Sequence, residues 1–112
     1  MERQSFRERY QRLEWPQQLG NLASTLARVS SRAPSPQYDT LVRNLLREAA
    51  LFIEWSVPHL PADILVDMAA MQRELLAWWH VWPLDQTRPL LALYARNTSD
   101  RVLHMAGLVR QS

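Results

Sequence analysis

Residues 61–82, PADILVDMAAMQRELLAWWHVW, carry the clearest structural signal in the sequence. Apolar side chains recur in it every three or four residues, and charged or amide side chains occupy much of the other side. This spacing matches the turn of an α-helix, so the stretch predicts a helix that buries one face. Pro61 and Pro83 mark the two ends, because proline is tolerated in the first turn of a helix and stops one further along. The apolar positions are Ile64, Leu65, Met68, Met71, Leu75, Trp78, Trp79 and Trp82.

The rest of the chain shows the same period. It predicts a short helix over residues 2–14 and longer helices over residues 16–29, 36–56 and about 86–107. Residues 30–37, SSRAPSPQ, form the clearest loop, because serine and proline dominate and no large apolar side chain is present.

Local signals suggest where the helices begin and end. Ser35 is a typical N-cap for the helix over 36–56, and Asp85 or Thr87 could cap the last helix. Gly107 is a typical C-terminal cap. Thr98 falls on the apolar face of the last segment, which favours one bent helix over two short ones.

A chain of 112 residues has the usual size of one domain. Short connections join the expected helices, so helices 36–56 and 61–82 should be antiparallel neighbours. We therefore expect an all-α fold: a four-helix up-down bundle with a short extra N-terminal helix, in one domain over residues 1–112.

The composition excludes several kinds of chemistry. The chain has no cysteine and only 2 glycines, so a thiol nucleophile, a cysteine-bound metal and a phosphate-cradling loop are all ruled out. The HExxH zinc motif and the Glu-x-x-His motif of di-iron bundles are also missing. His59, His80 and His104 are interpreted as surface residues; the alternatives are a metal shared by Asp100 and His104, or a haem held by His80 or His104. We predict no enzyme activity, catalytic residue, cofactor or metal.

Charge is unevenly distributed along the chain. All 13 cations other than histidine are arginine, and the net charge is +2. Residues 1–32 and 86–112 are basic, whereas residues 33–85 are acidic. Basic ends either pair with the acidic middle or offer a face to an anionic partner. No apolar stretch approaches the length of a membrane span, and no secretory signal is present. We therefore expect a cytoplasmic protein with no transmembrane segment, and peripheral membrane contact stays open.

Tryptophan and arginine are enriched at binding hot spots, which makes the 5 tryptophans the best candidates for an interface. The alternative is that they plug the ends of the helical core. Adjacent helical residues point about 100° apart, so Trp78 and Trp79 cannot both face the centre of one stripe. We expect one of them, and Trp55, at the edge of the core. The candidate partner-binding residues are Trp78, Trp79, Trp82, Arg3 and Arg7.

Four segments together resemble a short, conserved, all-helical cyanobacterial protein family of unknown function. They are RERY at 7–10, QLGNLASTLARVSS at 18–31, FIEW at 52–55 and RVLHMAGL at 101–108. The resemblance implies a bacterial cytosolic or thylakoid-associated setting, and it supplies no catalytic residue.

These observations predict a non-enzymatic module that binds another protein or a second copy of itself, as an adaptor, assembly factor or regulator. One alternative is a nucleic-acid-associated regulator that uses the basic terminal helices, although no module that reads bases is recognisable. A carrier with a small-ligand pocket between its helices is the other.

Overall fold

The computed structural model describes residues 2–108, with side chains from residue 5 onward. Within that range the chain forms five α-helices and several short 3₁₀ turns, and no strand occurs. The all-α prediction is therefore confirmed. The helices are α1 (Glu2–Gln11), α2 (Trp15–Arg32), α3 (Asp39–Ser56), α4 (Leu65–Val81) and α5 (Arg88–Met105). The 3₁₀ turns are Pro36–Tyr38, Val57–His59, Ala62–Ile64 and Asp85–Thr87.

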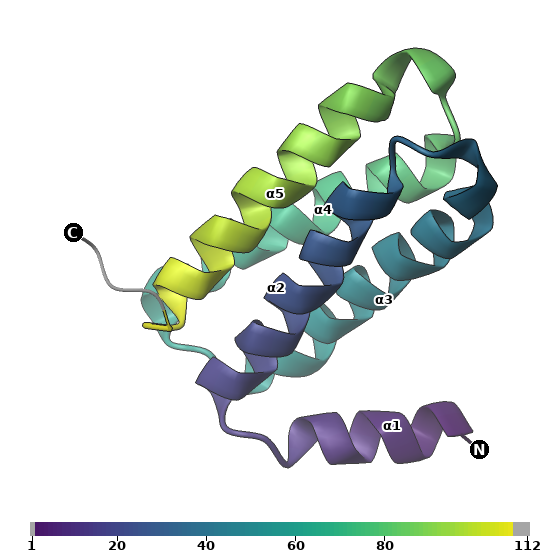
Figure 1. The fold of residues 1–112 in the computed structure, drawn as a ribbon. Helices are drawn as coiled ribbons and strands as arrows, with labels where there is room; N and C mark the ends of the chain where they lie inside the picture. Colours follow the sequence, from purple (N-terminus) through teal and green to yellow (C-terminus); the bar gives the residue numbers. More distant parts are fainter. Residues whose placement is uncertain (1, 109–112) are drawn as a thin grey trace.

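The four longer helices lie side by side, and α1 crosses beneath the lower end of α2 and α3 (Figure 1). The closest backbone approaches join α2 to both α3 and α5, and α3 to α4. The backbones of α4 and α5 stay further apart, so side chains make most of the contact between those two helices.

Several helix boundaries differ from the sequence prediction. Helix α1 ends at Gln11 instead of residue 14, because the chain turns there and brings Gln18 against Tyr10. Helix α2 continues to Arg32, so the predicted loop over 30–37 shrinks to the few residues before the Pro36–Tyr38 turn. The Ser30 hydroxyl, predicted in that loop, donates from the helix to a carbonyl of α5.

The predicted N-caps are also wrong in detail. Ser35 precedes a 3₁₀ turn, and its side chain makes no capping hydrogen bond. Thr87 does precede α5, but its hydroxyl donates to the Leu84 carbonyl at 2.8 Å, and Asp85 accepts from Arg88 instead. The Thr87 and Asp85 side chains stabilise the connection in front of α5, while 3₁₀ hydrogen bonds tighten the first turns.

The predicted C-terminal cap is confirmed. Gly107 has φ of 72°, a left-handed conformation that glycine adopts without steric cost. The Gly107 amide donates to the His104 carbonyl and the Leu108 amide to the Leu103 carbonyl, each at 3.0 Å. This is the Schellman pattern, and it satisfies carbonyls that the end of α5 would otherwise leave unpaired.

The core consists of the apolar faces that the periodicity predicted. Thr98 is buried with them, and α5 runs through it without interruption. Helices α2 and α5 approach closely through small residues: the Ser99 hydroxyl donates to the Ala23 carbonyl at 2.8 Å, and Gly20 lies under the Leu108 side chain. Buried members of the core include Leu19, Leu22, Leu26, Val29, Val42, Leu46, Ile53, Met68, Met71, Leu75, Leu91 and Val102.

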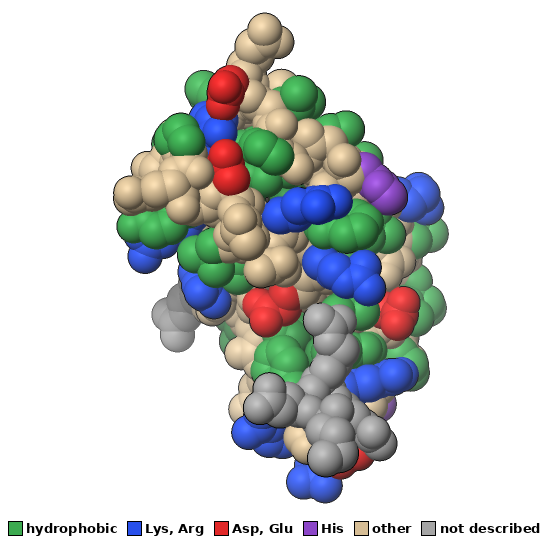
Figure 2. Space-filling model, turned by 90° about the vertical axis from the view of Figure 1, so that its right-hand side faces the viewer, with side chains coloured by type: hydrophobic (Ala, Val, Ile, Leu, Met, Phe, Trp, Pro, Cys, Tyr) green, Lys and Arg blue, Asp and Glu red, His purple; other side chains and the backbone are tan. Residues whose placement is uncertain are grey.

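The uneven charge along the sequence does not produce one separate basic face on the side seen in Figure 2. Basic and acidic side chains are intermingled there, with hydrophobic side chains visible between them. An anionic partner would therefore need a local group of cations. Arginines of α3 and α5 lie against the tryptophans at the end of α4 in two separate clusters.

Candidate functional site

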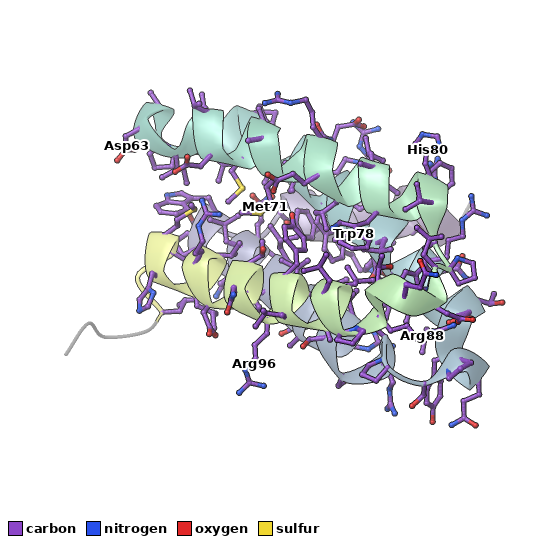
Figure 3. All side chains as sticks on the ribbon, turned by 90° about the horizontal axis from the view of Figure 1, so that it is seen from above. Asp63, Met71, Trp78, His80, Arg88 and Arg96 are labelled. Carbon is purple, nitrogen blue, oxygen red and sulfur yellow. The ribbon has the colours of Figure 1, made fainter. Side chains whose placement is uncertain are left out.

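Of the three tryptophans at the end of α4, Trp78 and Trp82 contact each other, with ring centroids 6.5 Å apart, whereas Trp79 points elsewhere. Trp78 is half-buried between α4 and α5, with its ring centroid 6.3 Å from that of Tyr94 (Figure 3). Trp79 is half-buried on the α3 side, and Trp82 is buried at 3 % exposure. Successive helical positions point about 100° apart, which explains the divergence of Trp78 and Trp79. The three predicted partner-binding tryptophans therefore do not form one surface patch.

The first candidate is a closed cluster made of Arg88, Asp39, Asp85 and Trp82. The Arg88 guanidinium donates to both oxygens of Asp39, at 2.6 and 2.8 Å, and twice to Asp85 Oδ1, at 2.8 and 3.0 Å. It also donates to the Ala33 carbonyl at 3.1 Å and lies 5.2 Å from the centre of the Trp82 ring. These contacts tie the α2–α3 connection to the start of α5.

The electrostatics of the closed cluster are those of a satisfied ion pair. Hydrogen bonds to Asp39 and Asp85 raise the pKa of Arg88, and the Arg88 guanidinium holds the pKa of Asp39 below its ordinary value. The side chains of Arg88 and Asp39 are only 10 % and 25 % exposed, whereas that of Asp85 is 87 % exposed. The sheltered Arg88–Asp39 pair leaves little room for an outside ligand, so its role is structural.

The second candidate is an open cluster made of Arg43, Arg47 and Trp79. The guanidinium carbons of Arg43 and Arg47 lie 4.7 and 5.3 Å from the centre of the Trp79 ring, within the range of cation–π attraction. Arg43 Nε also donates to the Trp79 carbonyl at 3.1 Å, and the His80 ring is 4.9 Å from that of Trp79. Both arginines and His80 are exposed, and the His80 side chain points outward in Figure 3.

Within the part of the chain whose side chains are described, no carboxylate forms an ion pair with the open cluster. Among the side chains of residues 5–108, Arg43 and Arg47 form no ion pair. Nearby acids are engaged on other sides of their helices: Glu48 accepts from Thr25 of α2 at 3.2 Å, and Glu74 accepts from Tyr94 of α5 at 2.9 Å. The edge between α3 and α4 therefore presents two arginines on an aromatic platform without a counter-charge.

The predicted basic residues lie at the opposite end of α3. Arg7 is exposed, with its guanidinium carbon 5.9 Å from the centre of the Trp55 ring, and the side chain of Arg3 lies outside the described residues. The prediction that Trp55 sits at the edge of the core is wrong, since it is 4 % exposed. Phe6 and Tyr10 of α1 cover it, with ring centroids 6.1 and 5.7 Å away.

A buried polar network fixes α1 to the bundle at this end. Tyr10 Oη donates to the Gln18 carbonyl at 2.9 Å and lies 2.6 Å from Ser56 Oγ, while Gln18 Nε2 donates to the Tyr10 carbonyl at 3.1 Å. Burial raises the pKa of the Tyr10 phenol, since the anion would lose its hydration there. The network is packed inside the molecule, so it positions α1 and offers nothing to a ligand.

The remaining polar side chains do not assemble into a metal-binding group within the part of the chain that the structure describes. His59, His80 and His104 are exposed, and no group of three metal-ligating side chains gathers among these residues. None of the helices between residues 2 and 108 is long and apolar enough to cross a membrane.

The sequence analysis identified Trp79 but missed Arg43 and Arg47. A signal was available: the two arginines are four residues apart on the helix that runs antiparallel to the tryptophan-rich one. Comparison of the chain with protein-family models, curated proteins and solved structures finds no match. The open cluster is the feature with the strongest physical claim to a function, because its arginines are exposed and form no ion pair within residues 5–108.

Proposed function

We propose that this protein is a non-enzymatic, cytoplasmic module that binds another protein, as an adaptor, assembly factor or regulator. In this proposal the four longer helices act as an up-down bundle that supports the binding surface. The resemblance to a cyanobacterial family supports a bacterial setting for the proposed module.

The open cluster is the observation that supports this proposal best. A half-exposed tryptophan flanked by arginines has the composition of a binding hot spot. The hydrogen bond from Arg43 to the Trp79 carbonyl already restrains one of the arginines. Such preorganisation reduces the entropy that is lost when a partner binds.

The nucleic-acid alternative has less support. It depends on the basic terminal segments, but Arg88, one of the 4 arginines of the segment 86–112, is neutralised by Asp39 and Asp85. Arg7, from the other basic segment, lies beside the Trp55 ring.

Affinity purification from a lysate of the source organism tests the proposal, with three versions of the chain as bait. Trp79→Ala removes the centre of the open cluster, and Leu93→Ala removes an exposed apolar side chain of α5 as a matched control. We expect one or more specific proteins with the wild type and with Leu93→Ala, and their loss with Trp79→Ala at unchanged helical content by circular dichroism. Recovery of the bait alone under gentle conditions would overturn the proposal, and equal recovery of partners by Trp79→Ala would show that binding does not use the open cluster.

A further inference from the structure

The geometry of the open cluster leads us to propose the chemistry of its partner. The cluster binds a segment rich in aspartate or glutamate, whose carboxylates accept hydrogen bonds from Arg43 and Arg47. The inference deepens the proposed function and rests on it for the statement that the partner is a protein.

The first support is the number of free donors. A guanidinium carries five N–H groups, and among the described residues Arg43 uses only its Nε–H, on the Trp79 carbonyl. The structure gives Arg47 no hydrogen-bond acceptor within residues 5–108. Each arginine therefore keeps a planar fork of donors, which fits a carboxylate through two parallel hydrogen bonds.

The second support is the uncompensated charge. Arg43 and Arg47 are four residues apart on α3, where like charges repel one another. Their positions are about 6 Å apart along the helix axis. Two carboxylates with a similar separation, for example four residues apart on a partner helix, would pair with both arginines and remove this repulsion.

The third support comes from the closed cluster, in which carboxylates of the same chain neutralise an arginine that lies against a tryptophan. Arg88 lies against Trp82 and is paired with the carboxylates of Asp39 and Asp85. The open cluster has the arginines and the tryptophan, but no acid of residues 5–108 pairs with it. The partner segment supplies the carboxylates that Asp39 and Asp85 supply in the closed cluster.

An acidic protein segment fits the cluster better than a nucleic acid does. Two arginines would neutralise only two phosphates, and the chain as a whole has a net charge of only +2 with 11 acidic residues. Proteins that bind single strands offer aromatic rings for base stacking, whereas guanidinium groups already lie against Trp79.

Binding of fluorescently labelled poly-L-glutamate, followed by anisotropy at low salt, tests the inference. We expect the wild type to bind and added salt to weaken the binding. Arg43→Gln with Arg47→Gln should weaken it by at least about tenfold, because both donor forks are lost. Arg28→Gln with Arg96→Gln removes the same charge from exposed arginines of α2 and α5, and should keep most of the affinity. The Arg96 side chain extends away from the bundle in Figure 3.

A lysine pair separates charge from geometry. Arg43→Lys with Arg47→Lys keeps both charges and loses the planar forks, so its affinity should lie between those of the wild type and the glutamine pair. Circular dichroism of each variant shows that the fold is retained.

Three outcomes would overturn the inference: no binding of poly-L-glutamate by the wild type, equal weakening by the two glutamine pairs, or tighter binding of single-stranded poly-dT. Failure of the proposed function gives a different result, because even the wild type then captures no specific partner from the lysate. If a specific partner is captured from the lysate equally by the wild type and by the Arg43→Gln and Arg47→Gln pair, the module binds a protein but not through carboxylates at this cluster.

Discussion

The closed and open clusters are assembled from the same kinds of side chain at the same end of α4, and they differ in their acids. In the closed cluster Arg88 is held by Asp39 and Asp85 over a buried Trp82. In the open cluster Arg43 and Arg47 flank a half-exposed Trp79, and no ion pair forms within the described chain.

The difference assigns a separate role to each cluster. Removing part of the closed cluster leaves buried surface or sheltered charge without a partner, so the cost should appear in the stability of the fold. Removing part of the open cluster affects exposed groups, so the cost should appear in binding.

The largest contrast is between the two tryptophans. Trp82→Ala should lower the free energy of unfolding by about 3–5 kcal/mol, the usual cost of removing a buried tryptophan side chain. Trp79→Ala should cost only about 1–2 kcal/mol, because its ring is partly hydrated and it loses two cation–π contacts. Urea unfolding measures both, and equal costs would show that Trp79 is a core residue.

Replacing Arg88 should lower the stability of the fold more than replacing Arg43. Arg88→Gln leaves Asp39 and the buried Ala33 carbonyl without their donor, whereas Arg43→Gln removes an exposed side chain. We therefore expect the thermal midpoint to fall clearly in the Arg88 variant and to stay near the wild-type value in the Arg43 variant. Scanning calorimetry compares them, and similar midpoints would contradict a structural role for the closed cluster.

Acid should affect the closed cluster alone. Arg88 holds the pKa of Asp39 below its ordinary value of 3.8, so the ionised carboxylate favours the folded state. This contribution is complete above about pH 4 and is lost as the pH falls through the lower folded-state pKa. The stability advantage of the wild type over Asp39→Asn should therefore shrink below about pH 4. Unfolding curves at several pH values test this, and a constant difference down to about pH 2 would refute it.

The smallest effect is expected for the pair Arg43→Gln and Arg47→Gln. Its free energy of unfolding should stay within about 0.5 kcal/mol of the wild type, the usual range for surface positions. Lost attraction to Trp79 opposes relief of the repulsion between the two arginines. A much larger loss of stability, measured by urea unfolding, would show that the open cluster stabilises the fold.

Much of the fold could be predicted because it depends on local signals. The three- and four-residue spacing predicted the buried faces around Met68, Leu75 and Leu91, and the left-handed preference of glycine predicted the cap at Gly107. Burial of Thr98 inside one continuous helix followed from the same spacing.

The features that could not be predicted depend on contacts between distant parts of the chain. Trp55 is buried because α1 folds back over it, and nothing in FIEW indicates where α1 lies. Arg88 and Asp39 are 49 residues apart, so their pairing depends on how the helices are arranged. Only the spacing of Asp85 and Arg88, three residues apart around a helix start, was a local hint.

The most direct test of the difference between the clusters is a titration with poly-L-glutamate followed through the tryptophan indole N–H signals by NMR. The Trp79 signal is assigned from its absence in Trp79→Phe, and that of Trp82 from Trp82→Phe. We expect a saturable shift of the Trp79 signal that added salt reverses, and no shift of the Trp82 signal. A shift at Trp82, or no shift at Trp79 under conditions where the polymer binds, would contradict it.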